Sequence, residues 1–129
     1  MALTILNRQR KVPIDLATMR TRLEAAMAAA RVGDQEVTLV LVSDAAIRRL
    51  NREWRDVDAP TDVLSFPARE GDGAAFAGDE LGDIVISLER AKEQGPIHVP
   101  GVAPGQAFEA EVRFLFVHEI GRASCRERG

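Results

Sequence analysis

The stretch VTLVLVSDAAIRRL, residues Val37–Leu50, decides the fold because it joins a strand pattern directly to a helix pattern. Its first part, Val37–Val42, is a short apolar run rich in β-branched side chains, which predicts a buried strand. Ser43 follows as a helix N-cap, and the residues from Asp44 to Arg55 then have helical spacing. The sequence therefore predicts a buried strand that passes straight into a helix.

Further strand and helix patterns lie on both sides of this stretch. We expect strands at Leu3–Leu6, Asp62–Phe66 and Leu81–Ser87. We expect a helix with Pro13 near its first turn, a short helix from Leu88 to Gly95 and a helix at Gln106–His118. Glycine and proline predict loops at Arg69–Glu80 and Pro96–Gly105. Interleaved elements of this kind favour a small α/β or α+β domain.

Composition limits the class of protein. With 129 residues, 46% of them hydrophobic, the chain fits one domain with a real core and is too apolar for disorder. No apolar run approaches the roughly 18 residues that cross a bilayer, and the N-terminus lacks a signal-peptide layout, so we expect a cytoplasmic protein with no membrane partner. The single cysteine, Cys125, excludes an internal disulfide. The formal charge of −3 means that nucleic-acid contact needs a local basic face.

Three arginines form such a face on the helix expected at Asp44–Arg55. At about 100° per residue, Arg48, Arg52 and Arg55 fall on one side of this helix. The apolar residues on the other side are Ala46, Ile47, Leu50 and Trp54. Guanidinium groups suit phosphate oxygens because they donate paired hydrogen bonds in one plane. The alternative is a solvated face without a ligand.

The segment after this helix, Asp56–Pro67 (DVDAPTDVLSFP), runs from a turn with two aspartates and a proline into an apolar strand. One interpretation is a structural connection in which Asp and Thr side chains bond the local backbone. The other is a loop that holds Arg55 beside a site.

His118 ends the apolar helix expected at Gln106–His118. Helical spacing places it on a face with Phe108, Val112 and Leu115, where a lone histidine is more often a core residue than a ligand. A zinc site needs further nitrogen, sulfur or carboxylate ligands, and the natural second position on a helix is i+4. That position is Arg122, whose guanidinium stays protonated and cannot bind a cation.

Three segments carry a resemblance that covers nearly all of the first 118 residues: LNREWRDVDAPTDVLSFP (Leu50–Pro67), LGDIVIS (Leu81–Ser87) and FLFVH (Phe114–His118). In order and spacing, the chain resembles the YbeY family of bacterial endoribonucleases. The resemblance implies a single α+β domain with a small mixed β-sheet of about four strands and flanking helices. It implies metal-dependent cleavage of single-stranded RNA in ribosomal RNA maturation and ribosome quality control. The expected partners are ribosomal RNA and the ribosome or its associated proteins, and no DNA.

The resemblance also implies one zinc ion (Zn²⁺) held by three histidines in the pattern H-G-x-x-H-x-x-x-x-x-H. His118 matches the first histidine and is the metal ligand expected here. The other two positions hold Arg122 and Arg128, and Glu119 stands in place of the glycine. The zinc site implied by the family is therefore incomplete in this sequence.

Arg55 matches the arginine of the family's R-x-x-D-x-P-T-D-V-L-S-F-P block. By this resemblance Arg55 is the expected catalytic residue, binding the phosphodiester and stabilising charge in the transition state. Arg48 and Arg52, on the same helical face, are expected to extend that contact along the RNA backbone without reading bases.

Agreement with the family stops at His118. The tail Glu119–Gly129 (EIGRASCRERG) is polar and basic, and EIGRA matches the translation of a common DNA-sequencing adapter, GAGATCGGAAGAGC. We therefore expect a family domain at residues 1–118, incomplete at its C-terminus, and a foreign tail at 119–129 in which only Glu119 and Ile120 are ambiguous. We expect impaired nuclease activity, and the alternative is a non-catalytic ribosome- or RNA-binding module.

Overall fold

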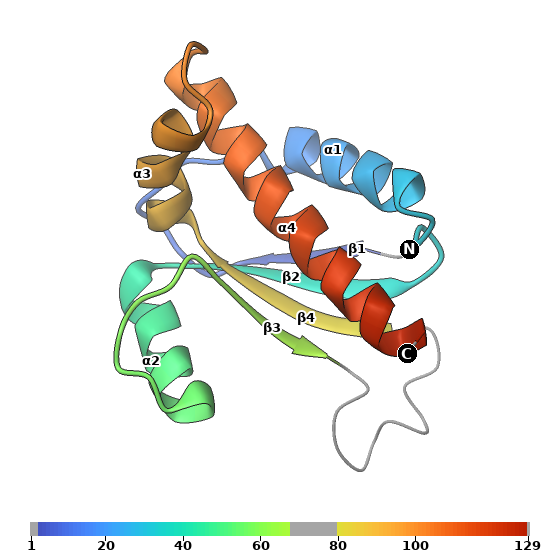
Figure 1. The fold of residues 1–129 in the computed structure, drawn as a ribbon. Coiled ribbons are helices and arrows are strands. Elements are labelled where there is room, and N and C mark those ends of the chain that lie inside the picture. The colour runs from blue at the N-terminus through green and yellow to red at the C-terminus, as the bar shows by residue number, and fades with distance from the viewer. Residues whose placement is uncertain (1–2, 68–79, 129) are drawn as a thin grey trace.

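The structure, a computed structural model, describes the backbone of residues 3–67 and 80–128, and side chains within 3–66 and 81–122. Its elements, in chain order, are β1 (Leu3–Asn7), α1 (Leu16–Ala29), β2 (Glu36–Val42), α2 (Asp44–Arg55), β3 (Val63–Pro67), β4 (Glu80–Ser87), α3 (Leu88–His98) and α4 (Pro104–Arg128). Figure 1 shows α1, α3 and α4 on one face of a sheet and α2 on the other. The predicted loop Arg69–Glu80 lies outside the described residues, apart from Glu80, which begins β4.

The sheet has four strands in the order β1-β2-β4-β3. Strand β2 pairs in parallel with β1 and with β4, whereas β3 pairs antiparallel with β4. The expected α+β domain with a small mixed sheet is therefore confirmed. The apolar run that predicted a buried strand forms β2 near the centre of the sheet, where Leu39 and Leu41 are fully buried.

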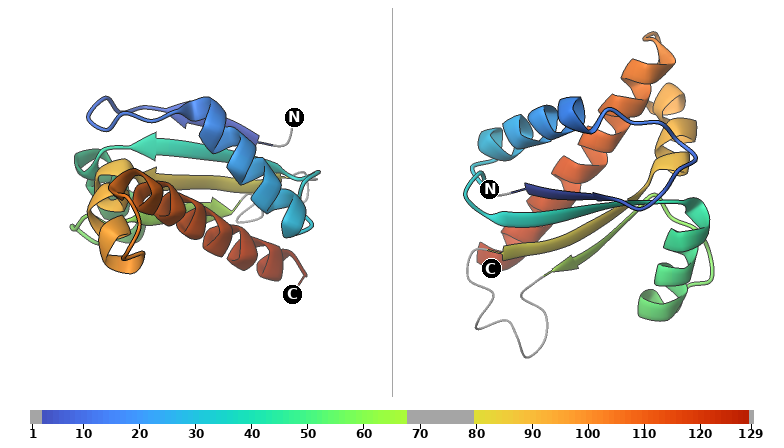
Figure 2. Two further views of the ribbon diagram at one scale, coloured as in Figure 1. Left: turned by 90° about the horizontal axis from the view of Figure 1, so that it is seen from above. Right: turned by 180° about the vertical axis from the view of Figure 1, so that it is seen from behind.

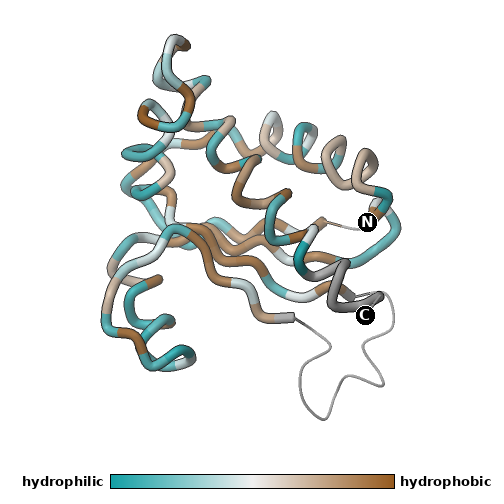
Figure 3. Tube along the Cα trace, viewed as in Figure 1, coloured by the Kyte–Doolittle hydropathy of each residue, from teal (hydrophilic) through white to brown (hydrophobic). Residues whose placement is uncertain are grey.

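Two apolar clusters hold the layers together. The larger one lies between the sheet and helices α1, α3 and α4, and it includes Leu23, Leu39 and Phe116. The smaller one packs α2 against the opposite face of the sheet through Val42, Ile47, Leu64 and Val85. Figure 2 shows the helices and the sheet from above and from behind. In Figure 3 the strands are coloured mostly as hydrophobic and α2 mostly as hydrophilic.

Helix α2 begins and ends as the sequence predicts. The Ser43 side chain accepts a hydrogen bond from Ala46 N, which satisfies an otherwise unpaired N–H in the first turn. Asp56 ends the helix in the left-handed conformation, with φ of 60°, and this sends the chain back toward the sheet.

A polar cluster, the helix junction (Asp44, Ser87, Glu89 and Arg90), joins the first turns of α2 and α3. Asp44 accepts hydrogen bonds from Ser87 Oγ at 2.9 Å and from Arg90 Nη2 at 3.1 Å. The Asp44 backbone N–H donates to Glu89 Oε1 at 2.9 Å. The Arg90 guanidinium is the main reason that the Asp44 pKa lies below its ordinary value of 3.8.

Helices α3 and α4 approach each other unusually closely at Gly95. A Cβ atom on Gly95 would lie 2.7 Å from the Ala107 carbonyl oxygen, so the contact requires glycine. Nearby, His98 Nδ1 lies 2.9 Å from Oε1 of the buried Glu111 side chain on α4. These contacts make α3 and α4 a tightly packed pair.

Several predicted boundaries were wrong. Helix α1 begins at Leu16 with Asp15 as its N-cap, so Pro13 precedes the helix. Helix α3 continues through Pro96 to His98, because packing against α4 maintains a turn that proline disfavours locally. Helix α4 begins before Gln106 and continues beyond His118. No helix in the described residues combines the length and apolar character needed to cross a membrane.

Candidate functional site at the β3 rim

Arg55 reaches from the last turn of α2 to strand β3. Its Nη2 atom donates a hydrogen bond to the Ser65 carbonyl oxygen at 2.6 Å, and its Cζ atom lies 5.4 Å from the centroid of the Phe66 ring. The guanidinium can therefore combine a hydrogen bond with a cation–π contact. The residue remains exposed, so the planar group is fixed beside the strand while still reachable from solvent.

Arg48 and Arg52 turn toward the loop that follows α2. Arg48 Nε donates to Asp58 Oδ1 at 2.9 Å, and Arg52 Nη1 lies 3.9 Å from the same oxygen. The hydrogen bond from Arg48 holds the Asp58 pKa below its ordinary value of 3.8. Asn51, which is buried, donates to the Ala59 carbonyl oxygen at 2.9 Å. The loop is thus bonded to α2 through Arg48 and Asn51, whereas the structural interpretation expected Asp and Thr side chains to bond the local backbone.

Trp54 does not lie on the packed face of α2, where helical spacing placed it. Its side chain is 66% exposed, although Ile47 on the same stripe is fully buried. Trp54 instead contacts Phe66 edge-on, with the ring centroids 6.1 Å apart and the planes at 75°. The prediction was wrong because the last turn of α2 lies at β3, an edge strand, and the described residues place no further strand beyond it.

His118 also lies on a different face from the one predicted. Its side chain is 58% exposed, whereas Val112 and Leu115 are buried. The imidazole stacks on Phe114, with centroids 6.0 Å apart, and its Nδ1 lies 3.2 Å from Glu119 Oε2. The assignment to the core face was wrong because α4 turns Phe116 inward and leaves Phe114 and His118 toward solvent.

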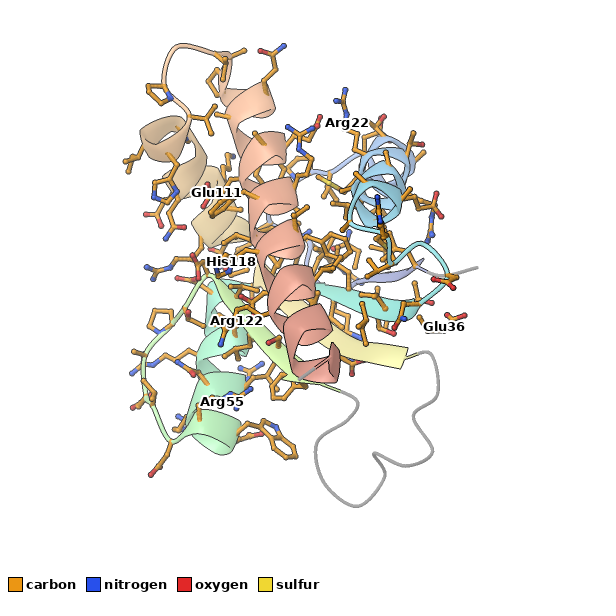
Figure 4. The ribbon with its side chains drawn as sticks, turned by 45° about the vertical axis from the view of Figure 1, so that its right-hand side comes forward. Arg22, Glu36, Arg55, Glu111, His118 and Arg122 are labelled. Atoms are coloured by element: carbon orange, nitrogen blue, oxygen red, sulfur yellow. The ribbon has the colours of Figure 1, made fainter. Side chains whose placement is uncertain are left out.

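Arg122 follows His118 by one helical turn and is paired with Glu119. Its Nη1 atom lies 3.3 Å from Glu119 Oε2, the oxygen that also faces His118. Figure 4 shows His118 and Arg122 along the same side of α4, with Arg55 at the far end of α2. Within residues 3–66 and 81–122, no group of three His, Cys, Asp or Glu side chains could hold a metal ion. The described residues therefore do not fit the three-histidine zinc site.

The end of α4 adjoins the strand that Arg55 contacts. Ser65 and Phe66 of β3 line the same small hollow as Glu119 and Ile120 of α4. Glu119 and Ile120, the two ambiguous residues of the tail, are both buried in the fold. The domain boundary at residue 118 and the origin of the tail stay predictions.

Two residues of this region were not predicted from the sequence: Trp54 as an exposed group and Phe66 as its partner. We call Trp54, Arg55, Ser65 and Phe66 the β3 rim. The position of Trp54 beside Arg55, at a helix end next to a turn, is a sequence signal that could have predicted its exposure. The structure brings Arg55 to the rim and directs Arg48 and Arg52 to Asp58, so the three arginines do not form one uniform surface. Their roles in catalysis and substrate binding stay predictions.

Comparison with known proteins agrees with the fold and identifies a family. Residues 4–120 match the family described as Endoribonuclease YbeY. A protein of that name from Moorella thermoacetica is 44% identical, with the match covering 92% of this chain and 78% of the relative. One from Pelotomaculum thermopropionicum is 40% identical, covering 93% and 79%.

Two shorter or more distant matches point the same way. A Heliobacterium modesticaldum protein named Endoribonuclease YbeY is 48% identical over 66% of this chain and 52% of the relative. The solution structure of a Thermotoga maritima protein superposes with a TM-score of 0.60 at 28% identity, covering 92% of this chain and 69% of that one. The chain therefore belongs to the endoribonuclease YbeY family.

Proposed function

We propose that this protein binds single-stranded ribosomal RNA at the β3 rim and is an RNA-processing endoribonuclease whose cleavage activity is strongly impaired. Family membership supports the endoribonuclease class. The observation that carries the proposal is the exposed guanidinium of Arg55, which Ser65 and Phe66 hold at the rim. A fixed guanidinium suits a phosphodiester because it loses little freedom on binding and can stabilise charge that develops during cleavage.

The proposed impairment follows from the residues beside His118. A histidine zinc site takes neutral nitrogen ligands, but the i+4 position carries the protonated Arg122 side chain. One imidazole paired with Glu119 is too few ligands for tight zinc binding. We therefore derive no metal-dependent step for this chain. The proposed partners are ribosomal RNA and ribosome-associated proteins in the cytoplasm, in ribosomal RNA maturation and ribosome quality control.

Metal content tests the impairment. The full chain is purified without chelators, and its zinc is measured by mass spectrometry. We expect far less than one zinc ion per chain, and one tightly bound ion per chain would overturn this part of the proposal. Arg122→His should raise zinc affinity, since two histidines at i and i+4 share a helix face, while Arg122→Ala should not.

A non-catalytic RNA-binding module is the second candidate function. The observation that favours it is that the rim presents a cation and exposed aromatic surface without needing a metal. End-labelled single-stranded ribosomal RNA fragments distinguish the two functions when binding and cleavage are measured together. Arg55→Ala should abolish residual cleavage by a nuclease, whereas in a pure binder no cleavage exists and only affinity falls. An Arg55→Ala variant with unchanged affinity and unchanged cleavage would contradict both.

A further inference from the structure

The largest exposed aromatic side chain of the rim has no role in the packing of the core. Trp54 is 66% exposed and lies outside both apolar clusters. An exposed indole loses the stability that burial would supply, so a binding surface is one physical reason for its position. The remaining contacts of Trp54 indicate what kind of ligand fits.

Phe66 links the indole to the neighbouring cation. Its ring meets Trp54 edge-on at 6.1 Å and lies 5.4 Å from Arg55 Cζ. Both side chains come from the last turn of α2, next to each other in sequence, and both rest on one strand residue. An aromatic surface and a phosphate-binding group therefore contact the same strand residue, Phe66.

The charge around Trp54 favours an anionic ligand over an apolar protein partner. Of the arginines on α2, Arg55 lies beside the same Phe66 ring as Trp54, whereas Arg48 and Arg52 face Asp58 of the following loop. Bases of single-stranded RNA can leave their stack and lie on an aromatic face while the backbone meets cations. A base within a duplex is already stacked and does not reach such a surface without a cost.

We infer that Trp54 is a stacking surface for one base of a single-stranded RNA whose neighbouring phosphate lies at Arg55. This rests on the RNA-binding function proposed above and deepens it by naming the residue that contacts a base. Stacking on an indole discriminates weakly between bases, so Trp54 favours purines modestly and reads no sequence. The surface would also select single strands over duplexes.

Fluorescence tests this directly because Trp54 is the one tryptophan of the chain, which has no tyrosine. The full-length protein is titrated with short oligoadenylate, oligouridylate and duplex RNA in metal-free buffer, and emission is recorded together with affinity from anisotropy of labelled RNA. We expect saturable quenching by the single strands, with tighter binding of oligoadenylate, and none by the duplex. Trp54→Ala should weaken binding by about tenfold, and Trp54→Phe should restore most of the loss.

Ile97→Ala is the matched control. Ile97 is 74% exposed on α3, away from the rim, so its removal should leave RNA affinity unchanged. If oligoadenylate binds without quenching and Trp54→Ala binds as tightly as the parent chain, the stacking inference is overturned while RNA binding stands. If no RNA binds at all, both the inference and the proposed function fail, and that result is recognisable because labelled RNA shows no anisotropy change.

Discussion

The two ends of helix α2 place polar side chains in opposite surroundings. At the first turn, which we call the closed end, Asp44 is 29% exposed and accepts hydrogen bonds from Ser87 and Arg90. At the last turn, which we call the open end, Trp54 and Arg55 lie on the surface at β3. The comparison shows that a charged residue cannot be assigned to a binding site from its sequence position alone. Its contacts in the folded protein must be known first. Partners at the first turn stabilise the fold, and open surface at the last turn is available to a ligand.

The largest stability loss should come from breaking the closed end. Asp44→Ala leaves Ser87 and Arg90 without their shared acceptor, and we expect it to lower the free energy of unfolding by about 2–3 kcal/mol. Urea denaturation measures the change. Lys92→Ala, an exposed position on α3, is the control and should stay within about 0.5 kcal/mol. Equal effects from the two substitutions would show that the junction contributes little.

Acid should weaken the closed end of α2, where Asp44 is the titrating group. The Asp44 pKa is lowered from 3.8, so the native state favours the carboxylate, and its stabilisation is present above that value and lost as pH falls through the lowered folded pKa. We expect the stability difference between the parent chain and Asp44→Ala to shrink on acidification below 3.8. Thermal melts from neutral pH downward test this, and a constant difference would contradict it.

A smaller loss is expected in the middle of α2, where Asn51 holds the following loop. Asn51→Ala removes the bond to the Ala59 carbonyl oxygen from a buried position, which should cost about 1–2 kcal/mol. Glu53→Ala, exposed on the same helix, serves as the comparison and should cost less. If Asn51→Ala also lowers RNA affinity, the loop contributes to the rim as well as to stability.

The smallest stability change is expected for the largest side chain, at the open end. Trp54→Ala removes exposed surface and one edge contact with Phe66, so we expect a loss of about 1 kcal/mol or less. Differential scanning calorimetry measures it. A loss as large as that of Asp44→Ala would mean that Trp54 has a structural role and would weaken the contrast between the two ends.

Local signals in the sequence were sufficient for the closed end of α2. Ser43 and the apolar stripe that includes Ile47 depend on neighbouring residues alone, so the start and end of α2 agree with the prediction. The family motif likewise identified Arg55 as a residue of interest. These features depend on residues within one or two helical turns of each other, and spacing over that range predicts local structure.

Other features depended on tertiary structure. The pairing of Arg48 with Asp58 requires the left-handed turn at Asp56, which folds the loop back along the helix. The exposure of His118 depends on which side of α4 meets the sheet, and a single histidine carries no signal for that. Trp54 was misplaced because the strand order, which leaves β3 at the edge, could not be derived from the sequence.

The hydrogen bond from Arg55 has a consequence for how copies of the protein behave toward one another. Ser87 N donates to Asp62 O across the β3–β4 pair. Backbone carbonyl groups along a strand face alternate sides, so Ser65 O, three residues further on, faces away from β4. An uncovered carbonyl there invites intermolecular strand addition and aggregation, and the Arg55 guanidinium occupies it. Arg55→Ala should therefore self-associate more readily, and light scattering can separate that from a loss of cleavage.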